Sequence, residues 1–154
     1  MKKLFIAIRN SDLDTVREIL AKKPELVACT AKQPPKKDDG QSPLQVALKT
    51  GNFDIADHLL ALGADVNAKD SYGNSCLWRA CLQASQILPR YNPAENKMSG
   101  ERLLTEEVEA DLSRIFRLLV KSGADINYVR PGIDRSVKEF YKNQTVERFL
   151  ALEN

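Results

Sequence analysis

Apolar residues recur with a helical period in short segments of this chain, and glycines separate the segments. The segment 40–70, GQSPLQVALKTGNFDIADHLLALGADVNAKD, contains two such stripes. They consist of Leu44, Ala47 and Leu48, then of Ile55, Ala56, Leu59 and Leu62. Each predicted helix has only about two turns, which is too short for stability on its own. The helical hairpin therefore needs neighbours that cover its apolar face.

The ends of these two helices match known capping patterns. Ser42 is a good N-cap, Pro43 fits the first helical position, and Gln45 completes a capping box. Gly51 can adopt the positive φ that turns the chain back, and Gly63 suits the position after the second helix. The caps and the apolar stripes thus predict the same helical hairpin.

This pattern returns along the chain with a period of about 33 residues, which is typical of stacked helical repeats. Gly73 follows Gly40 at this distance. The segment 115–127, IFRLLVKSGADIN, mirrors IADHLLALGADVN, and residues 4–20 mirror 44–60. Near the C-terminus we predict a last apolar face made of Val137, Phe140, Val146, Phe149 and Leu150.

Two recurring runs allow a comparison with a known family. They are Gly40-Gln41-Ser42-Pro43-Leu44 with Ala47, Gly51 and Leu59-Leu60, then Gly63-Ala64-Asp65-Val66-Asn67-Ala68, repeated as Gly123-Ala124-Asp125-Ile126-Asn127. With these runs the chain resembles the ankyrin-repeat family. The resemblance implies an all-α solenoid of about four helical hairpins in one domain over residues 1–154. Its units are 1–29, 37–69, 70–128 and 129–152, degenerate at both ends, and Gln45 replaces the usual histidine of the family.

The third unit contains an insertion, roughly 27 residues beyond the period. Pro89 and Pro93 exclude a continuous helix through it. After the insertion, Thr105 is a suitable N-cap for a long helix over 105–121, with an apolar stripe of Val108, Leu112, Ile115 and Leu119. Surface variation and a binding role are both open explanations of the insertion.

Composition and charge exclude several classes of function. The net charge of +2 is too small for the electrostatic footprint of a nucleic-acid-binding protein. Neither a signal peptide nor a membrane-spanning run is predicted. The three cysteines, Cys29, Cys76 and Cys81, form no CxxC pair, which favours free thiols in a reducing compartment. We expect a cytoplasmic protein, monomeric when free, that binds neither nucleic acid nor membrane.

Candidate chemistry is sparse. His58 is the only histidine, and we expect it at a half-buried surface position. The acidic run TEEVEAD, 105–111, is interpreted as the first turns of a helix, where acidic residues are favourable. Neither a phosphate-binding glycine loop nor a GxSxG motif is present. We therefore predict no catalytic residue, cofactor or metal. An enzyme with a pocket between the insertion and the inner helices is the alternative.

The resemblance implies that hairpin tips and inner helices form a binding surface for another protein. Tyr72, in the turn DSYG, is the expected aromatic anchor, whereas Trp78 is expected to fill the core. Tyr91 could either tie down the insertion or contact a partner. The positions assigned to partner binding are Arg9, Asn10, Asp38, Asp39, Gln41, Lys49, Ser71, Tyr72, Asn74, Leu82, Gln83, Arg90 and Tyr91, with Thr50, Arg130 and Ile133 as further positions.

The predicted function is a non-catalytic protein–protein interaction module. A small chain of this kind could act as an inhibitor or immunity-type protein that binds and occludes a partner protein. It could equally act as an adaptor that recruits a peptide motif. We expect recognition to concentrate on Tyr72, Leu82, Gln83 and the insertion from about Leu88 to Leu104, because interface anchors cluster near the centre of a patch.

Overall fold

The computed structural model describes residues 2–31, 40–99 and 105–150, without the side chains of 90–92, 98 and 99. Helices occur in consecutive pairs along the chain. The α-helices are α1 (Lys2–Arg9), α2 (Leu13–Lys22), α3 (Pro43–Lys49), α4 (Phe53–Ala61), α5 (Cys76–Ile87), α6 (Glu106–Lys121), α7 (Val137–Phe140) and α8 (Glu147–Leu150). A short 3-10 helix, η1 (Pro24–Ala28), follows α2.

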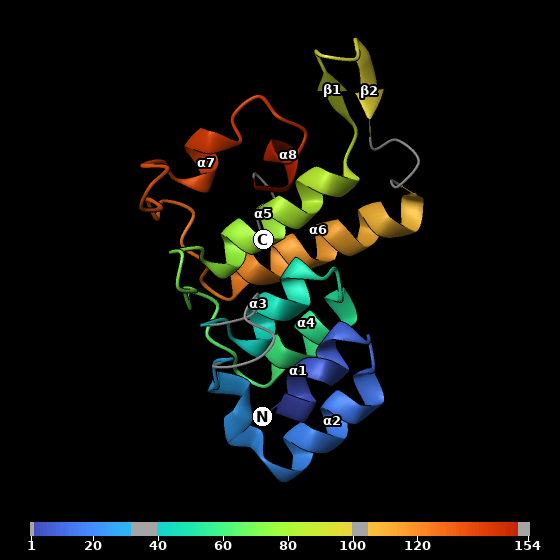
Figure 1. Ribbon diagram of the computed structural model, residues 1–154, viewed down its shortest axis with the longest axis vertical. Helices are drawn as coiled ribbons and strands as arrows, with labels where there is room; N and C mark the ends of the chain where they lie inside the picture. Colours follow the sequence, from blue (N-terminus) through green and yellow to red (C-terminus); the bar gives the residue numbers. More distant parts are fainter. Residues whose placement is uncertain (1, 32–39, 100–104, 151–154) are drawn as a thin grey trace.

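The hairpins stack on one another along the long axis of the molecule (Figure 1). The inner helices α1, α3, α5 and α7 contact one another in that order. The outer helices α2, α4, α6 and α8 form a second layer in the same way. The prediction of an all-α solenoid of four helical hairpins is therefore confirmed.

The predicted caps of the second hairpin are present. The backbone N–H of Gln45 donates to Ser42 Oγ at 3.2 Å, and the backbone N–H of Ser42 donates to Gln45 Oε1 at 3.0 Å. Gly51 has φ of 75°, in the left-handed region that favours glycine. These local features fix where α3 begins and where the chain turns into α4.

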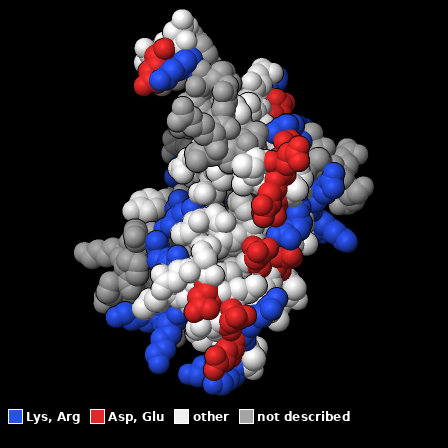
Figure 2. Space-filling model, turned by 90° about the vertical axis from the view of Figure 1, so that its right-hand side faces the viewer, with Lys and Arg blue, Asp and Glu red and all other residues white. Residues whose placement is uncertain are grey.

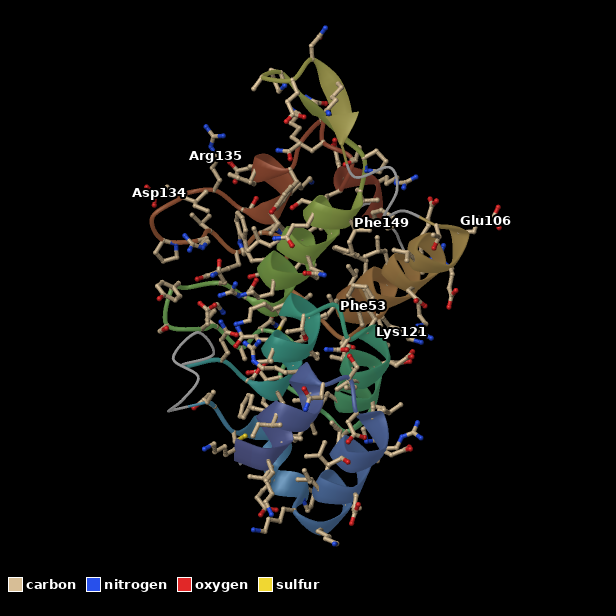
Figure 3. All side chains as sticks on the ribbon, turned by 45° about the vertical axis from the view of Figure 1, so that its right-hand side comes forward. Phe53, Glu106, Lys121, Asp134, Arg135 and Phe149 are labelled. Atoms are coloured by element: carbon tan, nitrogen blue, oxygen red, sulfur yellow. The ribbon has the colours of Figure 1, made fainter. Side chains whose placement is uncertain are left out.

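The core lies between the inner and outer layers and runs through all four hairpins. Ala47 and Ala80 are both buried, on the neighbouring helices α3 and α5. Trp78 fills the core as expected, with its ring 5.4 Å from that of Phe140 and 5.9 Å from that of Tyr141. At the C-terminal end, Phe149 extends from α8 towards α6, where its ring lies 5.6 Å from that of Phe116 (Figure 3).

The insertion of the third unit contains a small antiparallel hairpin. Strand β1 (Arg90–Asn92) pairs with β2 (Lys97–Ser99), with Tyr91 opposite Met98, and the hairpin projects at one end of the molecule (Figure 1). The predicted long helix after it is confirmed, because Thr105 Oγ1 accepts the N–H of Val108 at 3.2 Å and α6 continues to Lys121. Strands of three residues carry too little periodicity to be predicted from the sequence.

Within the described part of the chain, every helix is too short or too polar to cross a lipid bilayer.

Candidate functional site

The turns that connect successive hairpins touch one another in a row. A Cβ atom at Gly40 would lie 3.2 Å from Ser71, and one at Gly73 would lie 3.1 Å from Pro131. The hydroxyl of Tyr128 donates to the carbonyl oxygen of Gly73 at 2.7 Å. The tips of the second, third and fourth units therefore form one continuous edge, and the two glycines allow their close approach.

Asp70 holds the turn that presents Tyr72. Its Oδ1 atom accepts the backbone N–H groups of Tyr72 and Asn74, each at 2.9 Å. The backbone N–H of Asp70 donates to the carbonyl oxygen of Asn74 at 3.0 Å, which closes the turn. Tyr72 is 70% exposed at the tip of this turn. The aromatic side chain is thus displayed on a backbone fixed by hydrogen bonds.

The second carboxylate oxygen of Asp70 ties the turn to α5. Arg79 donates to Oδ2 from Nε at 3.1 Å and from Nη2 at 2.5 Å, and Asn74 donates to it at 3.2 Å. Burial opposes ionisation of this carboxyl group, but the hydrogen bonds from Arg79 and Asn74 outweigh it and hold the pKa of Asp70 below its usual value. Asp70 is therefore charged and paired at neutral pH.

Gln45 connects the same turn to the neighbouring inner helix. Its side-chain amide donates to the carbonyl oxygens of Ala68 and Asn74, each at 2.9 Å, while its Oε1 atom accepts the N–H of Ser42. The side chain is fully buried. Gln45 thus joins the second and third units, at the position where the family usually has a histidine.

The surface of α5 continues from this turn towards the C-terminal unit. Gln83 covers Gly51, where a Cβ atom would lie 2.9 Å from Nε2 of the glutamine. The adjacent Leu82 lines a pocket of about 500 Å³, together with Ser85, Phe140, Tyr141, Asn143, Gln144, Thr145 and Val146. Phe140 is 37% exposed in this pocket, whereas burial raises the pKa of the Tyr141 hydroxyl.

Most of the described positions predicted for partner binding are at least partly accessible. Asn10, Ser71 and Tyr72 are exposed. The remaining accessible positions are half-buried, namely Arg9, Lys49, Thr50, Leu82, Gln83, Arg130 and Ile133. Asp38 and Asp39 lie outside the described residues. Arg90 and Tyr91 contribute backbone to β1, and their side chains also lie outside the described part.

Two of the predicted binding positions are buried in the structure. Gln41 is 1% exposed and Asn74 is 5% exposed, so neither offers a surface to a partner. The side chain of Asn74 instead forms hydrogen bonds inside the protein. Its Nδ2 group donates to Asp70 Oδ2, and its Oδ1 atom accepts the Nε–H of Arg130 at 2.5 Å. The family resemblance indicated which positions of a repeat commonly bind a partner. It could not show that hydrogen bonds specific to this chain bury Asn74.

Phe140, which was predicted on the last apolar face, is 37% exposed, although its ring lies 5.4 Å from that of the buried Trp78. Ser136 and Glu139 form a capping box at the start of α7, which fixes the orientation of this short helix. Val137 and Tyr141, four residues apart, are buried, so Phe140 falls at the edge of the buried face.

Burial shifts the pKa values of the two thiols of α5 and of the histidine of α4. Burial raises the pKa of the Cys76 thiol to about 12 and raises that of Cys81 as well. His58 is half-buried, and burial together with Arg17 lowers its pKa. Among the residues that the structure describes, no three histidine, cysteine or acidic side chains lie close enough to hold a metal ion.

Residues 4–90 match the family model of ankyrin repeats, which spans three copies of the repeat. No protein with curated annotation matches the chain significantly.

Proposed function

The chain belongs to the ankyrin-repeat family, whose repeats indicate a protein–protein interaction module, and we propose that this module recognises its partner through the turns and inner helices of the third and fourth units. One observation carries the proposal. Tyr72 exposes most of its ring on a turn that Asp70 holds through two backbone N–H groups. Exposed aromatic side chains of this kind are common interface anchors.

The fixed turn favours binding for a thermodynamic reason. A flexible loop loses conformational entropy when it binds, and a loop that is already ordered loses less. The hydrogen bonds of Asp70 and the packing of Gly73 against Pro131 order this turn in the free protein. More of the interaction energy of Tyr72 therefore remains as affinity.

An inhibitor that occludes its partner is the form of this function that we favour over an adaptor. The turns of three successive units touch, so the recognition surface is rigid and continuous rather than a single isolated loop. A surface of this type can cover a broad area of another folded protein. Immunity-type inhibition belongs to this class of mechanism.

Calorimetric titration of Tyr72→Ala against a partner purified from the native host tests the proposal. We expect binding to weaken by about 1–4 kcal/mol, as for a typical aromatic anchor. The free energy of unfolding should change by less than about 1 kcal/mol, because the side chain buries little in the free protein.

Leu62→Ala is the matched control, since Leu62 is 45% exposed at the end of the outer helix α4. This variant should bind like the parent. Parent-like affinity of a folded Tyr72→Ala variant would contradict the proposal.

A further inference from the structure

Two successive turns of the solenoid can be compared residue by residue. One carries Tyr72 and comprises residues 68–75, after the run GADVN, and the other comprises residues 128–135, after the equivalent run GADIN. An isolated antiparallel bridge closes each of them. We refer to them as the Tyr72 turn and the following turn. Because both turns start from equivalent runs, the residues in which they differ indicate what is particular to each.

Tyr128 ties the following turn to the backbone of the Tyr72 turn. Counted from the two runs, it stands where the Tyr72 turn has Ala68, whose side chain has no polar group. Its hydroxyl donates to the carbonyl oxygen of Gly73, directly after Tyr72, at 2.7 Å. Lys69, which precedes Tyr72 by three residues, places Nζ 4.5 Å from the centre of the Tyr128 ring. This one side chain therefore contacts the chain on both sides of Tyr72.

Arg130 reaches the same turn through a series of side chains. It stands where the Tyr72 turn has Asp70, so the following turn has no carboxylate at that position. The Nε–H of Arg130 donates to Asn74 Oδ1 at 2.5 Å, and Asn74 Nδ2 donates to Asp70 Oδ2 at 3.2 Å. Asp70 Oδ1 in turn accepts the backbone N–H of Tyr72 at 2.9 Å. Hydrogen bonds thus connect the guanidinium of Arg130 with the backbone that displays the Tyr72 ring.

The tip of the following turn is small and packs against the Tyr72 turn. Gly132 takes the place of Tyr72, so no side chain stands at the equivalent position. Pro131, just before it, lies 3.1 Å from the place that a Cβ atom of Gly73 would occupy. The following turn therefore has no aromatic anchor at its tip, and Pro131 adds a packing contact to the two polar ones.

We propose, on the basis of the proposed function, that Tyr128 and Arg130 are positioning residues for Tyr72. They hold the Tyr72 turn in its binding conformation in the free protein, and this contribution to recognition needs no contact with the partner. When part of a population lacks the binding conformation, the apparent dissociation constant rises in inverse proportion to the competent fraction. Arg130, which the family resemblance placed among the binding positions, thus acts indirectly.

Hydrogen exchange of backbone amides in the free protein tests the positioning without a partner. The combined variant Tyr128→Phe with Arg130→Ala removes both polar contacts and keeps the aromatic ring. Exchange of the N–H groups of Tyr72 and Asn74, followed by NMR, should be accelerated about fivefold or more, as expected for the loss of a hydrogen bond that holds the turn. If the combined variant does not fold, Tyr128→Phe alone replaces it.

Tyr141→Phe with Arg114→Ala is the matched control, because it also removes one hydroxyl and one guanidinium group that connect neighbouring units. The Tyr141 hydroxyl is hydrogen-bonded to Ser85 on α5. Arg114 donates to Asp54 Oδ1 at 2.7 Å from α6, on the side where acidic and basic side chains lie next to one another (Figure 2). Neither contact involves the Tyr72 turn, so this control should leave the exchange of its amides unchanged.

Calorimetric titration against the partner purified from the native host tests the consequence for recognition. The combined variant should bind about fivefold more weakly, whereas the control should bind like the parent. In a Tyr72→Ala background the same two substitutions should change the affinity little, because a positioning residue acts only through the residue that it positions. Trp78 fluorescence shows whether α7 stays packed in each variant, since the Trp78 ring lies 5.4 Å from that of Phe140.

Three results would overturn the proposal. The first is parent-like exchange of the Tyr72 and Asn74 amides in the combined variant, and the second is parent-like affinity. The third is an equal loss of affinity with and without the Tyr72 ring, which would indicate direct contacts by Tyr128 or Arg130. In all three cases the proposed function stands if Tyr72→Ala weakens binding. If Tyr72→Ala binds like the parent, the proposed role of Tyr72 fails, and the exchange result still decides whether the following turn holds the Tyr72 turn.

Discussion

Replacement of Gln45 by alanine should destabilise the junction between the second and third units. The side chain is fully buried and has three hydrogen-bond partners. One of them, the Asn74 carbonyl, retains the N–H of Asp70 at 3.0 Å after the substitution. The Ser42 N–H loses its acceptor, and the Ala68 carbonyl keeps only a long contact of 3.9 Å with Cys76 Sγ. One buried and one part-buried polar group are therefore left without adequate partners.

The expected cost follows from these two groups. A buried donor or acceptor without a partner costs roughly 1–3 kcal/mol, and the Ala68 carbonyl, which is only part-buried, costs towards the lower limit, so the total is about 3 kcal/mol for Gln45→Ala. For a chain of this length such a loss lowers the melting temperature by about 6–12 °C. Urea titration and thermal melts followed by circular dichroism measure both quantities.

Gln86→Ala is the matched control for Gln45→Ala, because Gln86 is exposed on α5. Its free energy of unfolding should lie within about 0.5 kcal/mol of the parent value. If Gln45→Ala unfolds at the same urea concentration as this control, the two hydrogen bonds to the neighbouring turn do not hold the units together.

Three further predictions concern packing, pH and thiol reactivity. Ala47→Leu should overpack the contact of α3 with α5 and cost about 1–3 kcal/mol in urea titrations, whereas Ala61→Leu at an exposed position of α4 should cost little. Because the pKa of Asp70 is lowered in the folded state, its ionisation stabilises the fold above about pH 4, and this stabilisation is lost as pH falls through the folded-state pKa. When the pH is lowered from neutral to below about 4, the free energy of unfolding should therefore fall less for Asp70→Asn than for the parent. An equal fall in the two proteins would show that the pKa of Asp70 is not lowered by folding. In the native state Cys29, which is half-buried, should react with a thiol reagent before the buried Cys76 and Cys81, and equal rates without denaturant would refute this order.

Much of the fold could be predicted because the hairpin pattern is local and repeated. Ser42, Gln45 and Gly51 fix the limits of α3 through contacts only a few residues apart, and the structure confirms them. Thr105 gave the start of α6 for the same reason. Local caps and helical periodicity thus determine where the helices lie, even in the unit that the insertion interrupts.

The candidate surface was less predictable because it depends on contacts between units. Gln41 and Asn74 occupy positions that resemble binding positions, but this chain buries both. Phe140 is exposed because the α7 helix is short and its next turn is replaced by the segment that forms the pocket.

Site-specific photo-crosslinking tests most directly whether the turns and inner helices contact the partner. A photoreactive phenylalanine analogue placed at position 72 should capture one specific protein in extract of the native host. The same analogue at position 117, exposed on the outer helix α6, should not capture that protein. Capture from position 117 but not from position 72 would place recognition on the outer helices and contradict the account.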